Sequence, residues 1–455
     1  MNIERKKLRQ AEGKRLFDIS LLDSASVEDM INELWWLPRD IVSDGYDTAL
    51  KALSSQVPMN IYEYPTGMEC FTWIIPEKWT CYEGYLETLD GRRIFSYDEN
   101  PLHVVSYSLP FEGEVSRAEL FDHLHVHPRL AHAIPFAFKY YDREWGLCCS
   151  KETKNSLTDD TYKVVINTRF TDGTLKVGEV VIPGKSDECI VLCTHLCHPR
   201  MVNDGLSGVV VGIDVMRKLI CRGDLRYTYR LLIIPETIGS AAYLSHNEAL
   251  VPMMKGGLFL EMLGTCHPHA LQRSYDSDTE MDRCSELIVC EHDKTAWCDT
   301  FSNIVMNDER MFNAPGIRVP MLSLSKVTSK SHPDYPYKEY HSSMDTPASI
   351  NFEKLQDSRD LVLKIIDALE HNRIPVPKFK GEVFWARFKG IDYADMFHMV
   401  QSIPYHIDGK NTVVEICRKT GVEFSNALNF IKILAKENLI EWTDPTYPSF
   451  VTNNS

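Results

Sequence analysis

The apolar residues change their spacing along the chain, and each change marks a different kind of element. Residues 15–40 carry apolar side chains at helical spacing up to Pro38, and residues 44–54 repeat that spacing, so two helices are predicted. Residues 55–150 are rich in aromatic and β-branched residues, with Gly, Pro, Asp and Asn at short intervals, which indicates β-structure. Within them, LETLDGRRIFS predicts a hairpin with an Asp-Gly turn.

From residue 187 onward, buried strands alternate with helices. Continuous apolar runs of strand length occur in ECIVLCTH, YTYRLLIIP, GGLFLEML and VPMLSLS. Helices are predicted at GLSGVVVGIDVMRKLI and GSAAYLSHNEAL, and an amphipathic helix over residues 352–371 closes the region. This alternation predicts an α/β fold with a mostly parallel sheet flanked by helices.

The last part of the chain, after Pro375 and Pro377, reads as helix, helix, turn, helix and strand. TVVEICRKTG and EFSNALNFIKILAKENLI resemble the helices of a winged helix-turn-helix domain, with LIEWTD and PSFVT as its wing. The predicted division is an α/β domain over residues 1–54 and 151–373, an inserted β-rich domain over 55–150 and a winged helix over 374–455. The second helix has little basic excess, so a protein partner or homo-oligomer is expected there rather than nucleic acid.

Composition narrows the class of protein. The chain has 455 residues and a formal net charge of -15, which argues against general affinity for nucleic acid or anionic membranes. It has 13 cysteines without a small-scaffold spacing, no apolar signal core at the amino end and no apolar run long enough to span a membrane. A cytoplasmic protein with reduced thiols and no membrane contact is expected.

Metal-capable residues follow the predicted strands. ECIVLCTH ends at His195, with His198 and Asp204 in the loop THLCHPRMVNDGLSG, and later strands lead to Glu236 and Glu261. The loop YHSSMDTP adds His341. The carboxyl ends of strands are where open α/β sheets bind ligands, and imidazole and carboxylate are ligands that zinc prefers. The series predicts a zinc site, with two ions if Asp204 gives one oxygen to each.

The ordered motifs THLC, NDGLSG, PETIGS, EMLG and YHSSMDT, over residues 150–370, resemble those of the co-catalytic di-zinc aminopeptidases. This resemblance implies Asp204 as the bridging ligand, His195 and His341 as terminal ligands, and Glu236 and Glu261 as carboxylate ligands. The whole chain is similar to a bacterial group with an aminopeptidase-like domain, an inserted β module and a carboxy-terminal winged helix, often linked to polysaccharide biosynthesis.

Three positions depart from that family pattern. Pro235 precedes Glu236 where the family has a second glutamate, so Glu236 is either the ligand or the general base. Glu261 replaces an aspartate, and Cys197 replaces the aspartate that usually orients the first histidine. His198 is therefore a candidate ligand or a candidate orienting residue beside His195, and one zinc ion remains an alternative to two.

The predicted function is hydrolysis of an amide bond by a water that two zinc ions activate, most simply as an aminopeptidase on a small peptide or amino-acylated substrate. Glu236 would transfer the proton, and Tyr340 and His332 would contact the substrate. One alternative is an amidase, deacylase or aminoacyl-handling enzyme acting on a sugar or polysaccharide precursor. Another alternative is a catalytically inactive metal-binding scaffold or regulator that works through the winged helix. This alternative is considered because Pro235 replaces a glutamate of the family pattern.

Overall fold

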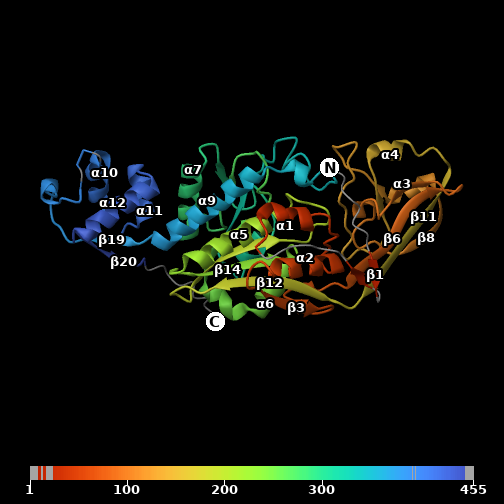
Figure 1. Cartoon of the computed structure of the whole chain (residues 1–455), viewed down its shortest axis with the longest axis horizontal. Coiled ribbons are helices and arrows are strands. Elements are labelled where there is room, and N and C mark those ends of the chain that lie inside the picture. Colours follow the sequence, from red (N-terminus) through yellow and green to blue (C-terminus); the bar gives the residue numbers. More distant parts are fainter. Residues whose placement is uncertain (1–8, 12–13, 17–23, 392, 395, 446–455) are drawn as a thin grey trace.

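Three parts follow one another along the long axis of the molecule (Figure 1). A large sheet with its helices lies in the middle, a smaller four-stranded sheet at one end and a helical carboxy-terminal module at the other. The structure is a computed structural model that describes residues 9–11, 14–16, 24–391, 393–394 and 396–445. Within these ranges, no helix is long and apolar enough to cross a membrane.

The large sheet has eight strands, of which the central four are parallel. In spatial order they are β17 (Trp297–Asp299), β16 (Ala270–Gln272), β18 (Met321–Ser325), β15 (Met254–Leu260), β13 (Cys189–His195), β14 (Thr228–Ile234), β12 (Thr174–Ile182) and β3 (Asn60–Pro65). Every residue of β13 is buried, as expected for a strand covered on both faces. The predicted α/β sheet flanked by helices is confirmed, with antiparallel strands added on both sides of the parallel centre.

Helices cover both faces of this sheet. The chain steps from β13 to β14 through α5 (Leu206–Arg222), then back past β13 to β15 through α6 (Ile238–His246). Right-handed crossovers in opposite directions place α5 and α6 on opposite faces, and Figure 1 shows them on the two sides of the sheet. The other main helices of this part are α1 (Val27–Leu34), α2 (Asp44–Ser54), α7 (Glu280–His292), α8 (Glu309–Asn313) and α9 (Phe352–His371).

The helices predicted at residues 44–54 and 352–371 are confirmed as α2 and α9, whereas the single helix predicted over residues 15–40 is wrong. Residues 14–16 form a strand, β2, paired with β1 (Arg9–Ala11), and α1 begins only after Ser26. Ser26 accepts a hydrogen bond from the Asp29 N–H while the Asp29 carboxylate accepts one from the Ser26 N–H. This capping box fixes the start of the helix, which the apolar spacing alone does not reveal.

The small sheet has the order β7 (Arg93–Ser96), β6 (Lys78–Thr88), β11 (Thr161–Thr171) and β8 (Phe111–Ser116). The hairpin predicted at LETLDGRRIFS is confirmed as the β6–β7 pair. After β11 the chain turns at Asp172 and Gly173 and enters β12 of the large sheet, so this Asp-Gly turn joins two sheets. The sheets do not follow the predicted boundaries at residues 55 and 150. The strand β3 lies within the predicted insert but belongs to the large sheet, and β11 lies after the insert but belongs to the small sheet.

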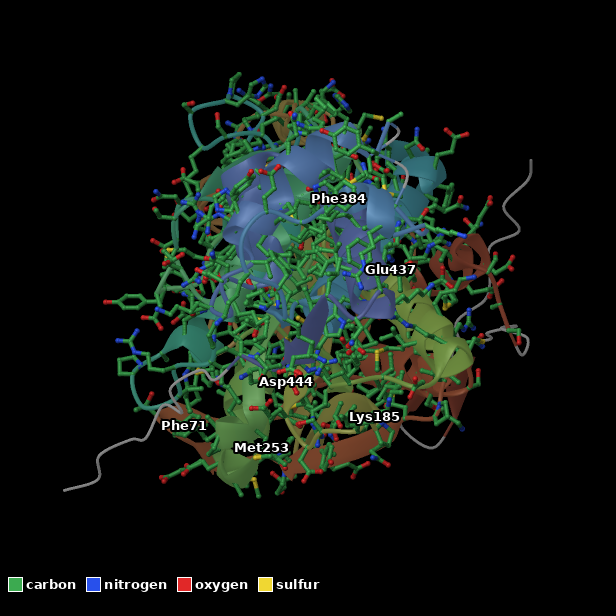
Figure 2. All side chains as sticks on the ribbon, turned by 90° about the vertical axis from the view of Figure 1, so that its left-hand side faces the viewer. Phe71, Lys185, Met253, Phe384, Glu437 and Asp444 are labelled. Carbon is green, nitrogen blue, oxygen red and sulfur yellow. The ribbon has the colours of Figure 1, made fainter. Side chains whose placement is uncertain are left out.

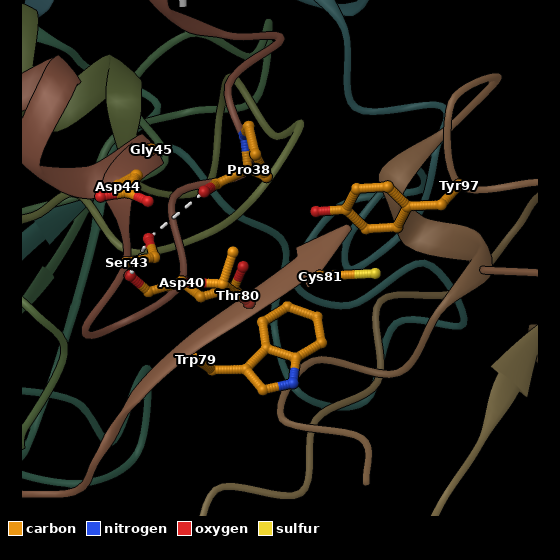
Figure 3. Close-up of a pocket in the computed structure, with 9 residues that line it drawn as sticks. All are labelled: Pro38, Asp40, Ser43, Asp44, Gly45, Trp79, Thr80, Cys81 and Tyr97. Atoms are coloured by element: carbon orange, nitrogen blue, oxygen red, sulfur yellow. Dashed lines mark hydrogen bonds between the residues drawn. The ribbon is translucent and has the colours of Figure 1, made fainter. Parts of the chain in front are cut away.

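The small sheet and the large one meet beside the start of α2. Figure 3 shows a crevice there, with Trp79 and Cys81 of β6 on one side and the segment from Pro38 to Gly45 on the other. Ser43 caps α2 by accepting a hydrogen bond from the Tyr46 N–H, and its Oγ lies 3.3 Å from Pro38 O. The Trp79 N–H of β6 donates to Val42 O at 3.1 Å, and Lys176 of β12 donates to Asp47 of α2 at 2.6 Å, so the start of α2 is tied to both sheets. Smaller elements of the small-sheet end are α3 (Arg117–His123), α4 (Lys151–Asn155) and the strand pair β9–β10 (Leu124–His125, Leu147–Cys148), whereas β4 of the pair β4–β5 (Glu69–Cys70, Trp73–Ile74) packs against α6.

The carboxy-terminal module contains α10 (Phe397–Ser402), α11 (Val413–Thr420) and α12 (Phe424–Lys436). The strand β20 (Ile440–Thr443), from the predicted wing, pairs antiparallel with β19 (Ile374–Pro377). The other predicted wing segment, PSFVT, lies outside the described residues, so the winged-helix assignment stays a prediction. Figure 2 views the molecule from this end, where Phe384 is 75% exposed.

Glu370, near the end of α9, joins that helix to the start of β14. Its carboxylate accepts hydrogen bonds from the Arg226 and Tyr227 N–H groups at 2.6 and 3.2 Å and from the Tyr229 hydroxyl at 2.8 Å. We expect Glu370→Ala to lower the free energy of unfolding by about 2 to 4 kcal/mol, since it leaves buried donors unpaired. Urea titration would measure the loss. Glu353→Ala, an exposed glutamate of the same helix, should change it by less than about 0.5 kcal/mol, and equal losses would contradict the assignment.

Candidate metal centre

Three adjacent parallel strands bring the sequence-predicted ligands together. His195 is the last residue of β13, Glu261 directly follows β15 and Glu236 lies two residues beyond β14. Because β15, β13 and β14 are neighbours, their carboxyl ends meet at one edge of the sheet. Asp204 lies just before α5, and His341 comes from the loop before α9.

Each carboxylate oxygen of Asp204 lies close to a histidine. Its Oδ1 lies 3.2 Å from His195 Nε2, which is also 3.6 Å from Glu261 Oε2. Its Oδ2 lies 3.0 Å from His341 Nε2. Two groups of potential ligand atoms therefore share this aspartate: His195, Asp204 and Glu261, and His198, Asp204 and His341.

His198 lies between His195 and Glu236. The Nδ1 atoms of the two histidines are 3.0 Å apart, and His198 Nε2 is 3.3 Å from Glu236 Oε2. Cys197 is fully buried beneath them, and its Sγ accepts a hydrogen bond from the Glu236 N–H at 3.0 Å. The thiol thus takes part in holding the loop that bears Glu236, and these four residues form a third group of potential ligands.

The geometry of the cluster fits divalent metal ions of the zinc type. Two ligand atoms about 2.0 to 2.2 Å from a tetrahedral zinc ion lie about 3.3 to 3.6 Å apart, close to the separations around Asp204. His195 Nε2, Asp204 Oδ2 and Glu261 Oε1 are also buried without a hydrogen-bond partner. Buried polar atoms are nearly always satisfied, so three unpaired atoms within one group of potential ligands indicate that cations complete the site.

The ionisation of the cluster follows from its burial. Burial raises the pKa of Glu236 above its usual range and that of Glu261 to about 8. Burial also holds the pKa of His198 well below its usual value. For Asp204, burial opposes ionisation, but the three surrounding histidines hold the pKa of its carboxyl well below the usual range. Bound cations would favour ionised carboxylates and neutral imidazoles, and so would oppose the effect of burial on Glu236 and Glu261.

Two glycines of NDGLSG are required by close packing at the cluster. A Cβ on Gly205 would lie 2.4 Å from His195 Nε2, and a Cβ on Gly208 would lie 2.0 Å from Leu260 O. These distances are far shorter than atomic contacts allow, so any side chain would displace His195 or the end of β15. The motif therefore lets α5 start directly against the metal ligands.

The loop that carries His198 is held by Arg39, a fully buried residue with no sequence signal. Its guanidinium donates hydrogen bonds to the carbonyl oxygens of Leu196, His198 and Met201 at 2.9, 2.7 and 2.8 Å. The planar fork of donors reaches several carbonyls at once, which fixes the turn in the backbone after β13.

Asp345 ties the His341 loop to the Asp204 loop. Its carboxylate accepts hydrogen bonds from the Asn203 and Asp204 N–H groups at 2.8 and 3.1 Å and from the Tyr337 hydroxyl at 2.7 Å. Burial raises its pKa to about 6.

The two predicted substrate-binding residues are placed differently. The ring of Tyr340 stacks on His341 with centroids 3.9 Å apart, so it borders the cluster. His332 is exposed in a loop, where its Nδ1 accepts a hydrogen bond from the Asp334 N–H, and within the described ranges no contact joins it to the ligands. Phe136, from the segment before β11, covers His198 and His341 edge-on at 5.1 and 5.3 Å.

Sequence reasoning missed Phe136, Arg39 and the pair Asn307–Asp308. Asn307 Nδ2 donates to Glu261 Oε2 at 2.8 Å, and Asp308 Oδ1 accepts from the Thr237 N–H at 2.8 Å. Neither residue follows a strand of the parallel centre or belongs to a family motif quoted above. Their positions depend on contacts across 46 and 71 residues of sequence, which local patterns do not encode.

The fold is that of the zinc aminopeptidases, and the buried histidines and carboxylates form a candidate metal site at the edge of its sheet. A zinc aminopeptidase from Bacillus subtilis superposes with a TM-score of 0.55 over 75% of this chain and 94% of its own, at 14% identity, which is a likeness of fold. A crystal structure from Clostridium acetobutylicum, provisionally named a peptidase, gives a TM-score of 0.83 at 30% identity over 92% of this chain and 96% of its own.

The particular family follows from the sequence match. Residues 28–372 match the model of the domain of unknown function DUF4910, and the chain belongs to that family. A Clostridium acetobutylicum protein provisionally named a polysaccharide biosynthesis protein with an aminopeptidase-like domain is 32% identical over 407 residues, which cover 88% of this chain and 92% of that protein. The recognised resemblance to aminopeptidase-like proteins of that kind is confirmed.

The Arg39 contacts generate a prediction. We expect Arg39→Lys to lower the free energy of unfolding by about 2 to 4 kcal/mol, because one ammonium cannot replace a fork that serves several buried carbonyls. Thermal or urea unfolding would measure it. The matched change Arg222→Lys, at a half-exposed residue paired with Asp367, should cost less than about 1 kcal/mol. Similar costs for the two variants would show that Arg39 does not hold the loop.

Proposed function

We propose that the protein is a metal-dependent hydrolase of an amide bond that uses two zinc ions, and that it acts as an aminopeptidase on a small peptide or amino-acylated substrate. The observation that carries this proposal is the position of Asp204, which belongs to two groups of potential ligands: its Oδ1 lies 3.2 Å from His195 Nε2 and its Oδ2 lies 3.0 Å from His341 Nε2. A carboxylate shared in this way is what a co-catalytic pair of metal ions needs.

The geometry favours one division of the ligands. His195, Asp204 and Glu261 would hold one ion, and His198, Asp204 and His341 the other. Glu236 is then left free of both ions. Its side chain is 32% exposed, whereas those of His195, Asp204 and Glu261 are at most 3% exposed, so it lies on the open side of the cluster.

Because Pro235 replaces a second glutamate, Glu236 alone would have to be both a metal ligand and the general base, and this division of the ligands removes that conflict. If His198 supplies the ligand that a second glutamate would otherwise give, Glu236 remains available to transfer the proton. The alternative division, with Glu236 on an ion, is supported only by the group that also contains Cys197 and His198. It would leave no carboxylate near the mouth of the site free to act as a base.

The residues of the chain then have distinct tasks. Two bound zinc ions would supply a water acidic enough to ionise near neutral pH and would polarise the scissile carbonyl. Glu236 would accept a proton from the nucleophilic water and pass it to the leaving amine, a task suited to a carboxyl whose pKa burial raises. Tyr340 would border the substrate. His332 would contact only a substrate long enough to reach the exposed loop in which this histidine lies.

A second candidate function is the hydrolysis or transfer of an acyl or aminoacyl group on a sugar precursor. The name of the 32% identical relative, which refers to polysaccharide biosynthesis, favours it. Turnover of amino-acid anilides but not of N-acylated amino sugars would select the aminopeptidase, and the reverse result would select the sugar precursor. A zinc-loaded protein that turns over neither class would support the inactive scaffold.

The division of ligands predicts the metal content of variants. Wild type purified without chelator should contain about two zinc ions per chain, His198→Ala about one, and Asp204→Ala less than one because it removes the shared ligand. Glu236→Gln should keep both ions while kcat falls by about 10²- to 10⁴-fold, since only the proton acceptor is lost. Elemental analysis and anilide hydrolysis would measure the two effects.

His132→Ala, at an exposed histidine, is the matched control and should keep both ions and full turnover. Loss of an ion in Glu236→Gln, with both ions retained in His198→Ala, would reverse the assignment of those two residues. A wild type without bound metal, even after zinc is added, would refute the hydrolase.

A further inference from the structure

Asn307 donates a hydrogen bond to one of the carboxylate ligands. Its side-chain Nδ2 lies 2.8 Å from Glu261 Oε2, the same oxygen that approaches His195 Nε2 at 3.6 Å. Asn307 is only 8% exposed, and Glu261 is 1% exposed. The contact is therefore shielded from water, so solvent does not compete with this hydrogen bond.

The backbone of Asn307 is itself fixed. Its N–H donates to both carboxylate oxygens of Glu309 at 3.0 Å. Gln272 of β16 donates to Glu309 Oε1 at 3.2 Å, and its own oxygen accepts from the Ile304 and Val305 N–H groups at 2.9 Å. The loop of residues 304–309 is thus tied to the large sheet, so the Asn307 amide reaches Glu261 from a fixed position.

Glu261 needs such a partner because of its length. Glutamate has one more rotatable bond than the aspartate it replaces in the family pattern, so holding its carboxylate in one place costs more conformational entropy. Asn307 is an uncharged donor, so it orients the carboxylate without neutralising the charge that would hold a cation. The other oxygen, Glu261 Oε1, is buried and has no hydrogen-bond partner.

The next residue of the loop, Asp308, contacts the segment that follows Glu236. Asp308 Oδ1 accepts hydrogen bonds from the Thr237 N–H at 2.8 Å and from Ser240 Oγ at 2.6 Å. Thr237 directly follows Glu236 and has a positive φ of 60°, a conformation that costs free energy unless neighbouring contacts hold it. One loop therefore contacts both Glu261 and the segment that directly follows Glu236.

We propose that Asn307 is the positioning residue of Glu261 and sets the affinity of the metal position formed by His195, Asp204 and Glu261. The proposal rests on the two-metal centre of the proposed function. Asn307 is not itself a ligand. It would control the metal position formed by His195, Asp204 and Glu261, and the metal position that includes His198 and His341 would be unaffected.

The test is a zinc titration of the full-length protein against a chromophoric chelator, which resolves the affinity of each ion. Asn307→Leu should bind one ion about 10- to 100-fold more weakly than wild type, the usual effect of losing a partner that orients a ligand, and the other ion equally well. Asn307→Asp, nearly the same shape without the donor, should show the same selective loss and serves if the leucine variant does not fold.

Two matched controls separate positioning from general damage. Asn313→Leu removes another buried asparagine, which donates to Glu309 O and Met321 O, and should lower the melting temperature without changing either zinc affinity. Asn303→Leu, at an exposed position, should change neither quantity.

Zinc affinities within threefold of wild type in both Asn307 variants would overturn the proposal, as would an equal loss of zinc in Asn313→Leu. A wild type that binds no zinc would overturn it together with the metal centre. A wild type that binds two ions but hydrolyses no substrate would refute only the proposed function, because the selective loss in the Asn307 variants is measured without turnover.

Discussion

The burial of several ionisable side chains at one edge of the sheet is the constraint on which the rest of the structure depends. Ionised groups lose hydration when they are buried, so they need either partners or bound cations. At this site the partners are other ligands, and some buried atoms are left unpaired. Such a cluster keeps its shape only if residues outside it hold its loops and side chains in place.

Three residues provide that support from different parts of the chain. Arg39 fixes the loop after β13, Asp345 joins the Asp204 and His341 loops, and Asn307 holds Glu261. Each is buried and makes at least one hydrogen bond to a group of the site that is distant in sequence, 159, 141 and 46 residues away respectively. The departures from the family pattern can be understood in the same terms, since Cys197 contacts the Glu236 backbone and Asn307 holds a longer carboxylate.

The segment that leads from the small sheet to the metal ligands has a part in the site as well. Ile134 and Ser343 exchange two hydrogen bonds, at 3.0 and 2.8 Å, and the Phe136 N–H donates to His341 O at 2.8 Å. The ring of Phe136 then covers His198 and His341. The β-rich part of the chain therefore does more than extend the molecule: it excludes water from one side of the cluster and holds the loop that presents His341.

The sequence by itself determined the elements whose signals are local. The helices at 44–54 and 352–371 follow from apolar spacing, and the candidate ligands at the ends of β13 and β15 follow from buried runs that stop at a polar residue. Only the tertiary structure decided that β11 joins the small sheet, that both His195 and His198 contact Asp204, and that Arg39 and Asn307 support the site. The reason is physical: periodicity reports which face of one element is buried, whereas strand pairing and ligand sharing depend on which distant segments meet, and that is fixed by packing the whole chain.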